Sequence, residues 1–95
     1  MRALFDQLSA GRLDRALLTP NANYYFTRQA IADYRASLAP LGRPTSIVAE
    51  SPPQLRGGFV TQGFTITYPK RTLSLSVFAE PDGARRIEQF LVTPG

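Results

Sequence analysis

The spacing of apolar residues changes near the middle of the chain, from a helical period to an alternating one. In the first half, apolar residues at positions 4, 5 and 8 predict a helix that ends at Gly11, because glycine commonly follows the last helical residue. A second short helix is expected over residues 13–17 and should stop before Pro20. The chain therefore begins with helices.

A third helix is predicted to follow the segment 21–26. Thr27 has the side chain of an N-cap, and Ile31, Tyr34 and Leu38 follow it on a single apolar stripe. A glycine and then a proline close this helix. The segment 21–26 is itself turn-forming and then aromatic, so we expect its rings to lie on the core.

From residue 45 onward, apolar and polar residues alternate, which is typical of an antiparallel sheet with one buried face and one wetter face. The pattern predicts four strands, over residues 45–51, 60–68, 73–77 and 87–92. The wetter face is rich in threonine and serine and is interrupted by Phe59 and Phe78.

The alternation also predicts a register. A four-residue loop between the second and third strands would set Tyr68 opposite Leu73 and Ile66 opposite Leu75, whereas a three-residue loop would set this apolar row against polar residues. In the final hairpin, both Ile87/Leu91 and Phe90/Val92 could meet this apolar row. The last strand is apolar on both faces, which predicts that it is covered on both sides.

The sequence Leu-Arg-Gly-Gly at residues 55–58 matches the end of a conjugation tail. Such a tail must end in its diglycine, but here Gly58 runs directly into Phe59. We therefore expect a bulge, a bend or a close backbone approach at a strand entrance. Arg56 is predicted to clamp this entrance to a helix or to segment 21–26. The alternative is that Arg56 lines a pocket and binds an anion there.

Composition excludes several classes of chemistry. The chain of 95 residues fits one domain, 1–95, and it contains neither cysteine nor histidine, so thiolate and imidazole catalysis are excluded. The net charge is +4, but the basic residues are scattered, so nucleic-acid binding is not expected. No run of about 18 apolar residues predicts a membrane span. An acidic residue at position 6 interrupts any signal peptide.

Catalytic residues are not evident. Only Glu50 and Glu88 among the seven carboxylates fall within predicted strands, and no catalytic residue, metal-ligand set or cofactor motif is assigned. Aromatic residues are more informative, because tyrosine hydroxyls that face a concave sheet can line a ligand pocket. The candidate pocket residues for a small-molecule ligand are Tyr24, Tyr25, Tyr34 and Arg56.

Three stretches of the chain resemble parts of the nuclear-transport-factor-2-like, or cystatin-like, superfamily. Residues 5–14 resemble its first helix and the break after it, residues 55–59 the opening of its long bent strand, and residues 81–89 its final hairpin. The resemblance implies an α+β fold in which three N-terminal helices pack on a strongly bent, cone-shaped, four-stranded antiparallel sheet. It spans nearly the whole chain.

Within that superfamily, the chain is most similar to an uncharacterised bacterial branch in which the domain follows a serine hydrolase or stands as a small secreted protein. The resemblance implies a non-catalytic accessory, ligand-binding or dimerisation domain, which would meet a second copy or a host hydrolase through its sheet face. The alternative is a small lyase- or isomerase-type enzyme that uses a tyrosine and a carboxylate. No functional residue carries over, since the superfamily's enzymes use a pocket histidine that is missing here.

The start of the chain bears on its location. Helical periodicity begins at once, with no preceding cap or linker, which suggests a chain excised from a longer one. The sequence does not indicate a compartment. If the parent chain is exported, we expect a periplasmic or secreted protein.

Overall fold

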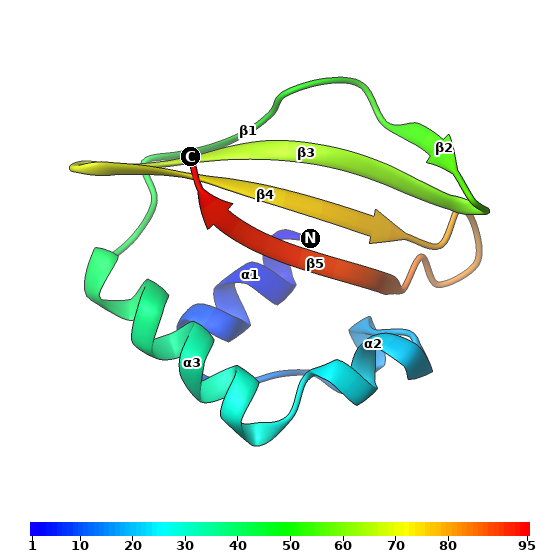
Figure 1. Ribbon diagram of the computed structural model, residues 1–95, viewed down its shortest axis with the longest axis horizontal. Helices are drawn as coiled ribbons and strands as arrows, with labels where there is room; N and C mark the ends of the chain where they lie inside the picture. The colour runs from blue at the N-terminus through cyan, green and yellow to red at the C-terminus, as the bar shows by residue number, and fades with distance from the viewer.

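The computed structural model describes residues 1–95 and shows an α+β fold in which the helices precede an antiparallel sheet (Figure 1). The α-helices are α1 (Arg2–Ser9), α2 (Pro20–Tyr25) and α3 (Arg28–Leu38), with short 3-10 turns η1 (Arg15–Leu17) and η2 (Ala39–Leu41). The strands are β1 (Ser46–Ala49), β2 (Gln54–Arg56), β3 (Phe59–Tyr68), β4 (Arg71–Ala79) and β5 (Ile87–Pro94).

The sheet has five strands, so the prediction of four is wrong by one. Its order is β1-β3-β4-β5, and β2 also pairs with β3. β1 and β2 pair with successive parts of β3 and together form one edge of the sheet, while β5 forms the other edge (Figure 1). The sheet is open and does not close into a barrel.

The diglycine forms a hairpin turn rather than a bulge. Gly57 and Gly58 have φ values of +57° and +82°, and they join the paired residues Arg56 and Phe59. Two consecutive positive φ angles are the signature of a type I′ turn, which glycine adopts without a Cβ penalty. The expected strand entrance is therefore the turn of a two-residue hairpin, in which β2 is the first strand and β3 the second.

The loop between β3 and β4 is shorter than predicted. Pro69 and Lys70 alone form it, so Ile66 lies opposite Leu73 instead of Leu75. The prediction of a four-residue loop is wrong, but both lengths are even, so apolar residues still face apolar residues. Proline suits this loop because its fixed φ matches the first central position of a tight turn.

The helices cover one face of the sheet (Figure 1). The predicted second helix is only the 3-10 turn η1, and segment 21–26 belongs largely to α2, which Pro20 begins. The expectation that the rings of this segment lie on the core is wrong for Tyr24 and Tyr25, which are 85% and 72% exposed. The buried core lies between the helices and the sheet and comprises Leu4, Phe5, Leu8, Leu18, Ala22, Phe26, Leu38, Ile66, Tyr68, Leu73, Leu75, Val77, Ile87 and Phe90.

A β-bulge near the start of β5 decides which residues of that strand are buried. Ile87 lies opposite Ala79, but Gln89 lies opposite Phe78, so Glu88 is an extra residue. The bulge shifts the alternation by one residue, which places Ile87 and the later Phe90 on the same buried face.

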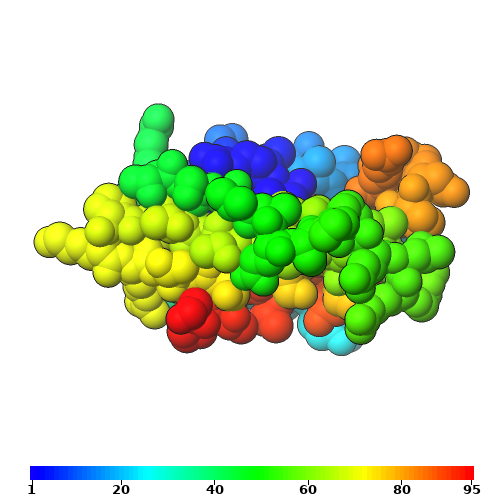
Figure 2. All heavy atoms as spheres, turned by 90° about the horizontal axis from the view of Figure 1, so that it is seen from above, coloured from blue at the N-terminus to red at the C-terminus, as the bar shows by residue number.

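The other face of the sheet carries no helix, and we call it the open face. In Figure 2, which looks onto it, strand segments in green, yellow and red spread across the surface and the helices show only at its rim. Leu91 is 48% exposed on this face, so the prediction that β5 is covered on both sides is wrong. By the register, its serines and threonines are Ser46, Thr61, Thr65, Thr67, Thr72, Ser74, Ser76 and Thr93.

Candidate functional site

A hollow of about 470 Å³ lies between α2, α3 and β5, and we call it the Tyr34 hollow. Phe26 and Phe90 line it, together with two of the predicted pocket residues, Tyr25 and Tyr34. Glu88 contributes a carboxylate to the same lining. The site therefore combines aromatic walls with one acidic group.

Tyr34 is held in this hollow by two aromatic contacts and a hydrogen bond. Its ring stacks on Phe26 at a centroid distance of 5.8 Å and meets Phe90 edge-on at 6.0 Å. Its hydroxyl donates a hydrogen bond to the Phe90 carbonyl at 3.2 Å. Burial raises the pKa of this hydroxyl above its usual value, and the nearby backbone of Val92 offsets part of that rise. The phenol is therefore protonated at neutral pH and acts as a donor.

A second hollow, of about 380 Å³, lies on the other side of Tyr34, between α3 and the end of β5. Ala30 and Tyr34 line both hollows, so the two are neighbours along one groove. Asp33 and Arg71 contribute opposite charges to the second hollow. Tyr34 thus divides a groove that follows the edge strand.

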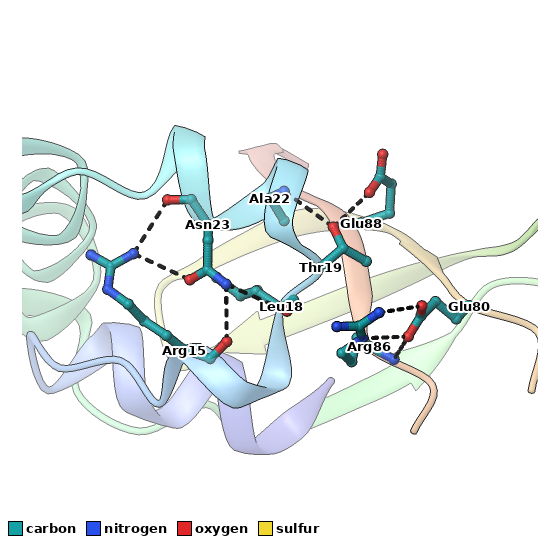
Figure 3. A network of polar contacts seen from close by, with 8 residues as sticks. All are labelled: Arg15, Leu18, Thr19, Ala22, Asn23, Glu80, Arg86 and Glu88. Carbon is teal, nitrogen blue, oxygen red and sulfur yellow. Dashed lines mark hydrogen bonds and ion pairs between the residues drawn. The ribbon is translucent and has the colours of Figure 1, made fainter. Parts of the chain in front are cut away.

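Glu88 joins β5 to the start of α2 (Figure 3). Its Oε1 accepts a hydrogen bond from the Thr19 hydroxyl at 2.6 Å, and its Oε2 accepts one from the Asn21 amide at 3.0 Å. The Thr19 hydroxyl also accepts from the Ala22 N–H, as an N-cap does. Both carboxylate oxygens are therefore engaged in holding the fold.

Arg86 lies two residues before Glu88 but does not pair with it. Arg86 instead donates two side-chain hydrogen bonds to Glu80, at 2.9 and 3.0 Å, across the base of the last hairpin (Figure 3). The Arg86 guanidinium lowers the pKa of the Glu80 carboxyl below its usual value, chiefly through these hydrogen bonds. This ion pair closes a hairpin and leaves Glu88 free to bond to α2.

The structure does not bring the four predicted pocket residues together. Tyr25 and Tyr34 share a hollow, but Tyr24 lines neither hollow beside α3. Arg56 lies on the open face, in a separate hollow of about 320 Å³ with Gln54 and Phe78. The set therefore divides between two faces of the sheet.

The predicted clamp role of Arg56 is wrong, because its exposed side chain makes no hydrogen bond or ion pair. The arginine that bonds to segment 21–26 is Arg15, from η1. Its guanidinium donates to the carbonyls of Phe26, at 2.7 Å, and Asn23, at 3.2 Å (Figure 3 shows the Asn23 contacts). Arg15 could not be chosen over the other arginines from the sequence, since its acceptors become neighbours only when α2 forms.

The open face carries two charged side chains on its β1–β2 side. Glu50 accepts a hydrogen bond from the Thr65 hydroxyl at 2.9 Å, and its other oxygen lies close above Gly63. A Cβ at Gly63 would lie 3.2 Å from that oxygen, so glycine gives the carboxylate room. The opposite charge comes from Arg56. It lies on the same face because it pairs with Phe59 in the β2–β3 hairpin.

No group of three or more histidine, cysteine, aspartate or glutamate residues is placed to hold a metal ion. None of the helices combines the length and the apolar character that crossing a membrane requires.

Comparison with known proteins gives no match: no family model matches the chain, and no match is found among curated proteins or solved structures.

Proposed function

We propose that this chain is a non-catalytic accessory domain of the nuclear-transport-factor-2-like kind and that it associates through its open face. The order of helices before an antiparallel sheet, with helices on one face only, supports this proposal. The partner is a second copy of the chain. In a longer polypeptide, a host hydrolase domain would occupy the same face.

The observation that carries the proposal is the uncovered sheet. Val48 and Leu91 are 58% and 48% exposed there, and Phe59 and Phe78 are only half-buried. Apolar side chains set among uncharged hydroxyls are cheaper to remove from water than a charged surface would be. The face thus has the chemistry of a contact surface.

The size of the face fits a small interface. The principal extents of the molecule are 36 × 31 × 17 Å, and Figure 2 looks along the middle one. A face of 36 by 17 Å offers roughly 600 Å² per partner, so two copies would bury about 1,200 Å², the lower end of the range for specific complexes. We therefore expect a dimer of modest affinity.

Self-association also suits the charges of the face. A twofold dimer places the same surface on both partners, so any contact between residues i and j occurs twice. Arg56 of one copy and Glu50 of the other can then pair reciprocally, because the face carries one of each. These pairs would fix the orientation of the two copies.

The test is the oligomeric state over a concentration series, by light scattering after size-exclusion chromatography. We expect the wild-type mass to rise toward that of a dimer and Phe78→Glu to remain monomeric. Leu55→Glu is the matched control, because Leu55 is a 68% exposed apolar residue whose side chain lies on the other side of the sheet. A wild-type protein that stays monomeric at millimolar concentration would contradict self-association.

The alternative function is a small-molecule site or a lyase- or isomerase-type enzyme in the Tyr34 hollow. The observation that favours it is that Tyr34 and Glu88 line the same hollow. Both groups are already hydrogen-bonded within the protein, so neither is a free acid or base. An NMR fragment screen whose shift changes cluster at Tyr34 and Phe90 would favour this alternative over a pure association domain.

A further inference from the structure

We propose that the outer edge of β5 binds an extended peptide, which adds a strand to the sheet beside residues 90–94 and places alternate side chains in the two hollows that flank Tyr34. This site is separate from the open face and goes beyond the function proposed above.

The hydrogen bonds of β5 show which of its backbone groups point outward. The Gly95 N–H donates to the Thr72 carbonyl, so Gly95 faces β4. Backbone groups alternate in direction along a strand, and therefore Leu91 and Thr93 also face β4. The backbone N–H and C=O groups of Phe90 and Val92 therefore point away from β4, toward the outer edge of the sheet. The Tyr34 hydroxyl, which reaches the Phe90 carbonyl from outside, agrees with this assignment.

The start of this edge is closed and the rest is open. Leu18 forms a parallel bridge with Ile87, and the Thr19 N–H donates to the Ile87 carbonyl at 3.0 Å. Beyond the bulge, no segment of the chain pairs with β5, which forms one margin of the face in Figure 2. The Phe90 N–H and the Val92 carbonyl are left without a protein partner.

Tyr34 stands where a residue of an added strand would stand. In a parallel pair, one residue donates its N–H to a carbonyl and accepts, through its own carbonyl, from the N–H two positions further on. The Tyr34 hydroxyl lies at this position, because it donates to the Phe90 carbonyl and lies near the Val92 backbone. It serves as a substitute partner that a peptide backbone can displace.

The hollows determine which peptide fits. Side chains on one face of a strand are about 7 Å apart, at positions i and i+2. One such side chain would enter the Tyr34 hollow against Ala22 and Phe26, and the next would enter the second hollow against Leu38 and Leu41. These walls favour apolar side chains at both positions. A second copy of β5 cannot supply them, since its own inward side chains are committed to its core.

The test uses a phage-displayed library of random dodecapeptides, selected on the wild-type protein and then measured as synthetic peptides by fluorescence anisotropy. Val92→Pro removes one outward N–H while leaving the ladder to β4 intact, which an edge strand tolerates. Val92→Thr is the matched control because it keeps that N–H. Thermal melts by circular dichroism verify that both variants fold.

We expect selected peptides with apolar residues at i and i+2 that lose at least tenfold in affinity for Val92→Pro and keep their affinity for Val92→Thr. Tyr34→Phe should bind them equally or more tightly, because it vacates the edge. Amide exchange by NMR should show protection of Phe90 and Val92 when peptide is bound. Failure to enrich any peptide, equal binding to folded Val92→Pro, or loss of binding in Tyr34→Phe would each overturn the proposal.

Discussion

The hydroxyl of Thr19 donates a hydrogen bond of 2.6 Å to the carboxylate of Glu88, across 69 positions of sequence. Thr19 is the N-cap of α2, and Glu88 is the extra residue of the β5 bulge. One hydroxyl thus satisfies the first turn of a helix and fixes that helix to the edge strand. The Tyr34 hollow depends on this attachment, because α2 forms one of its walls.

Thr19→Val should therefore cost more than the loss of an ordinary helix cap. We expect a loss of about 1–2 kcal/mol in unfolding free energy, since the variant removes the cap and leaves the Glu88 carboxylate short of a donor. Thr27→Val is the control, because Thr27 caps α3 in the same way but is exposed and bonds to no other strand or helix. It should cost about 0.5–1 kcal/mol in urea denaturation. Equal losses would show that the Glu88 bond adds nothing.

Arg15→Lys should loosen the end of α2. Lysine cannot reproduce the planar fork that reaches Asn23 and Phe26 at once, so we expect a loss of about 1 kcal/mol. Arg56→Lys should leave the denaturation midpoint unchanged, because Arg56 has no partner within the chain. The reverse ranking of the two variants in urea titrations would restore Arg56 as the structural arginine.

Tyr68→Phe should stabilise the protein. The Tyr68 hydroxyl is buried and has no hydrogen-bond partner among protein groups, and its removal relieves a desolvation penalty of about 1 kcal/mol. Tyr34→Phe is the matched comparison, and it should destabilise the fold by about 1 kcal/mol because that hydroxyl is bonded to Phe90. A thermal melt in which Tyr68→Phe unfolds at a lower temperature than wild type would contradict this reading.

The Glu80–Arg86 pair should make the free energy of unfolding depend on pH in the acidic range. The pKa of Glu80 is lower in the folded protein than its ordinary value of 4.5, so the unfolded chain takes up a proton first as the pH falls. The stabilisation is complete when the pH is above the pKa of Glu80 in the unfolded chain. It is lost as the pH falls through the lowered pKa of Glu80 in the folded protein. Glu80→Gln should therefore be less stable than wild type at pH 7, and the difference should vanish near pH 2. A constant difference across urea titrations from pH 2 to 7 would exclude this linkage.

Local signals in the sequence predicted several elements correctly. Thr27 caps α3 as expected, and the alternation over β3 and β4 gives the buried face on which Ile66 and Leu75 lie. These predictions succeed because a cap or an alternating row depends on neighbours within a few residues. The α+β order of helices before strands follows from the same patterns.

The errors arise where one residue type has two roles. Pro20 predicts the stop of one helix, but proline is also favoured at the first position of the next, and α2 begins there. Gly57 and Gly58 predict a bulge, a bend or a close backbone approach, but a Gly-Gly pair between two strand segments is equally a hairpin signal. The bulge at Glu88 could not be predicted, because it depends on the contact of β5 with Thr19.

The predicted pocket failed to assemble for a related reason. Tyr24 and Tyr25 are adjacent, and in a short helix only part of such a segment can face the core, which Phe26 does. The prediction that Arg56 reaches a helix or segment 21–26 fails because Arg56 belongs to β2, a strand that the sequence pattern does not predict. Its position on the open face follows from the alternation of the two-residue hairpin.

A single-cysteine scan tests the central claim most directly, since the chain has no cysteine of its own. Thr65→Cys, Ser74→Cys and Ser76→Cys place one thiol at the centre of the open face, and Leu55→Cys places one on the other side of the sheet. A disulfide needs Cα atoms within about 7 Å, so only thiols near a twofold axis will link. Face-to-face association predicts that mild oxidation at micromolar protein gives a covalent dimer for at least one face position and little for Leu55→Cys. If none of the three face variants cross-links faster than Leu55→Cys, the open face does not bind a second copy.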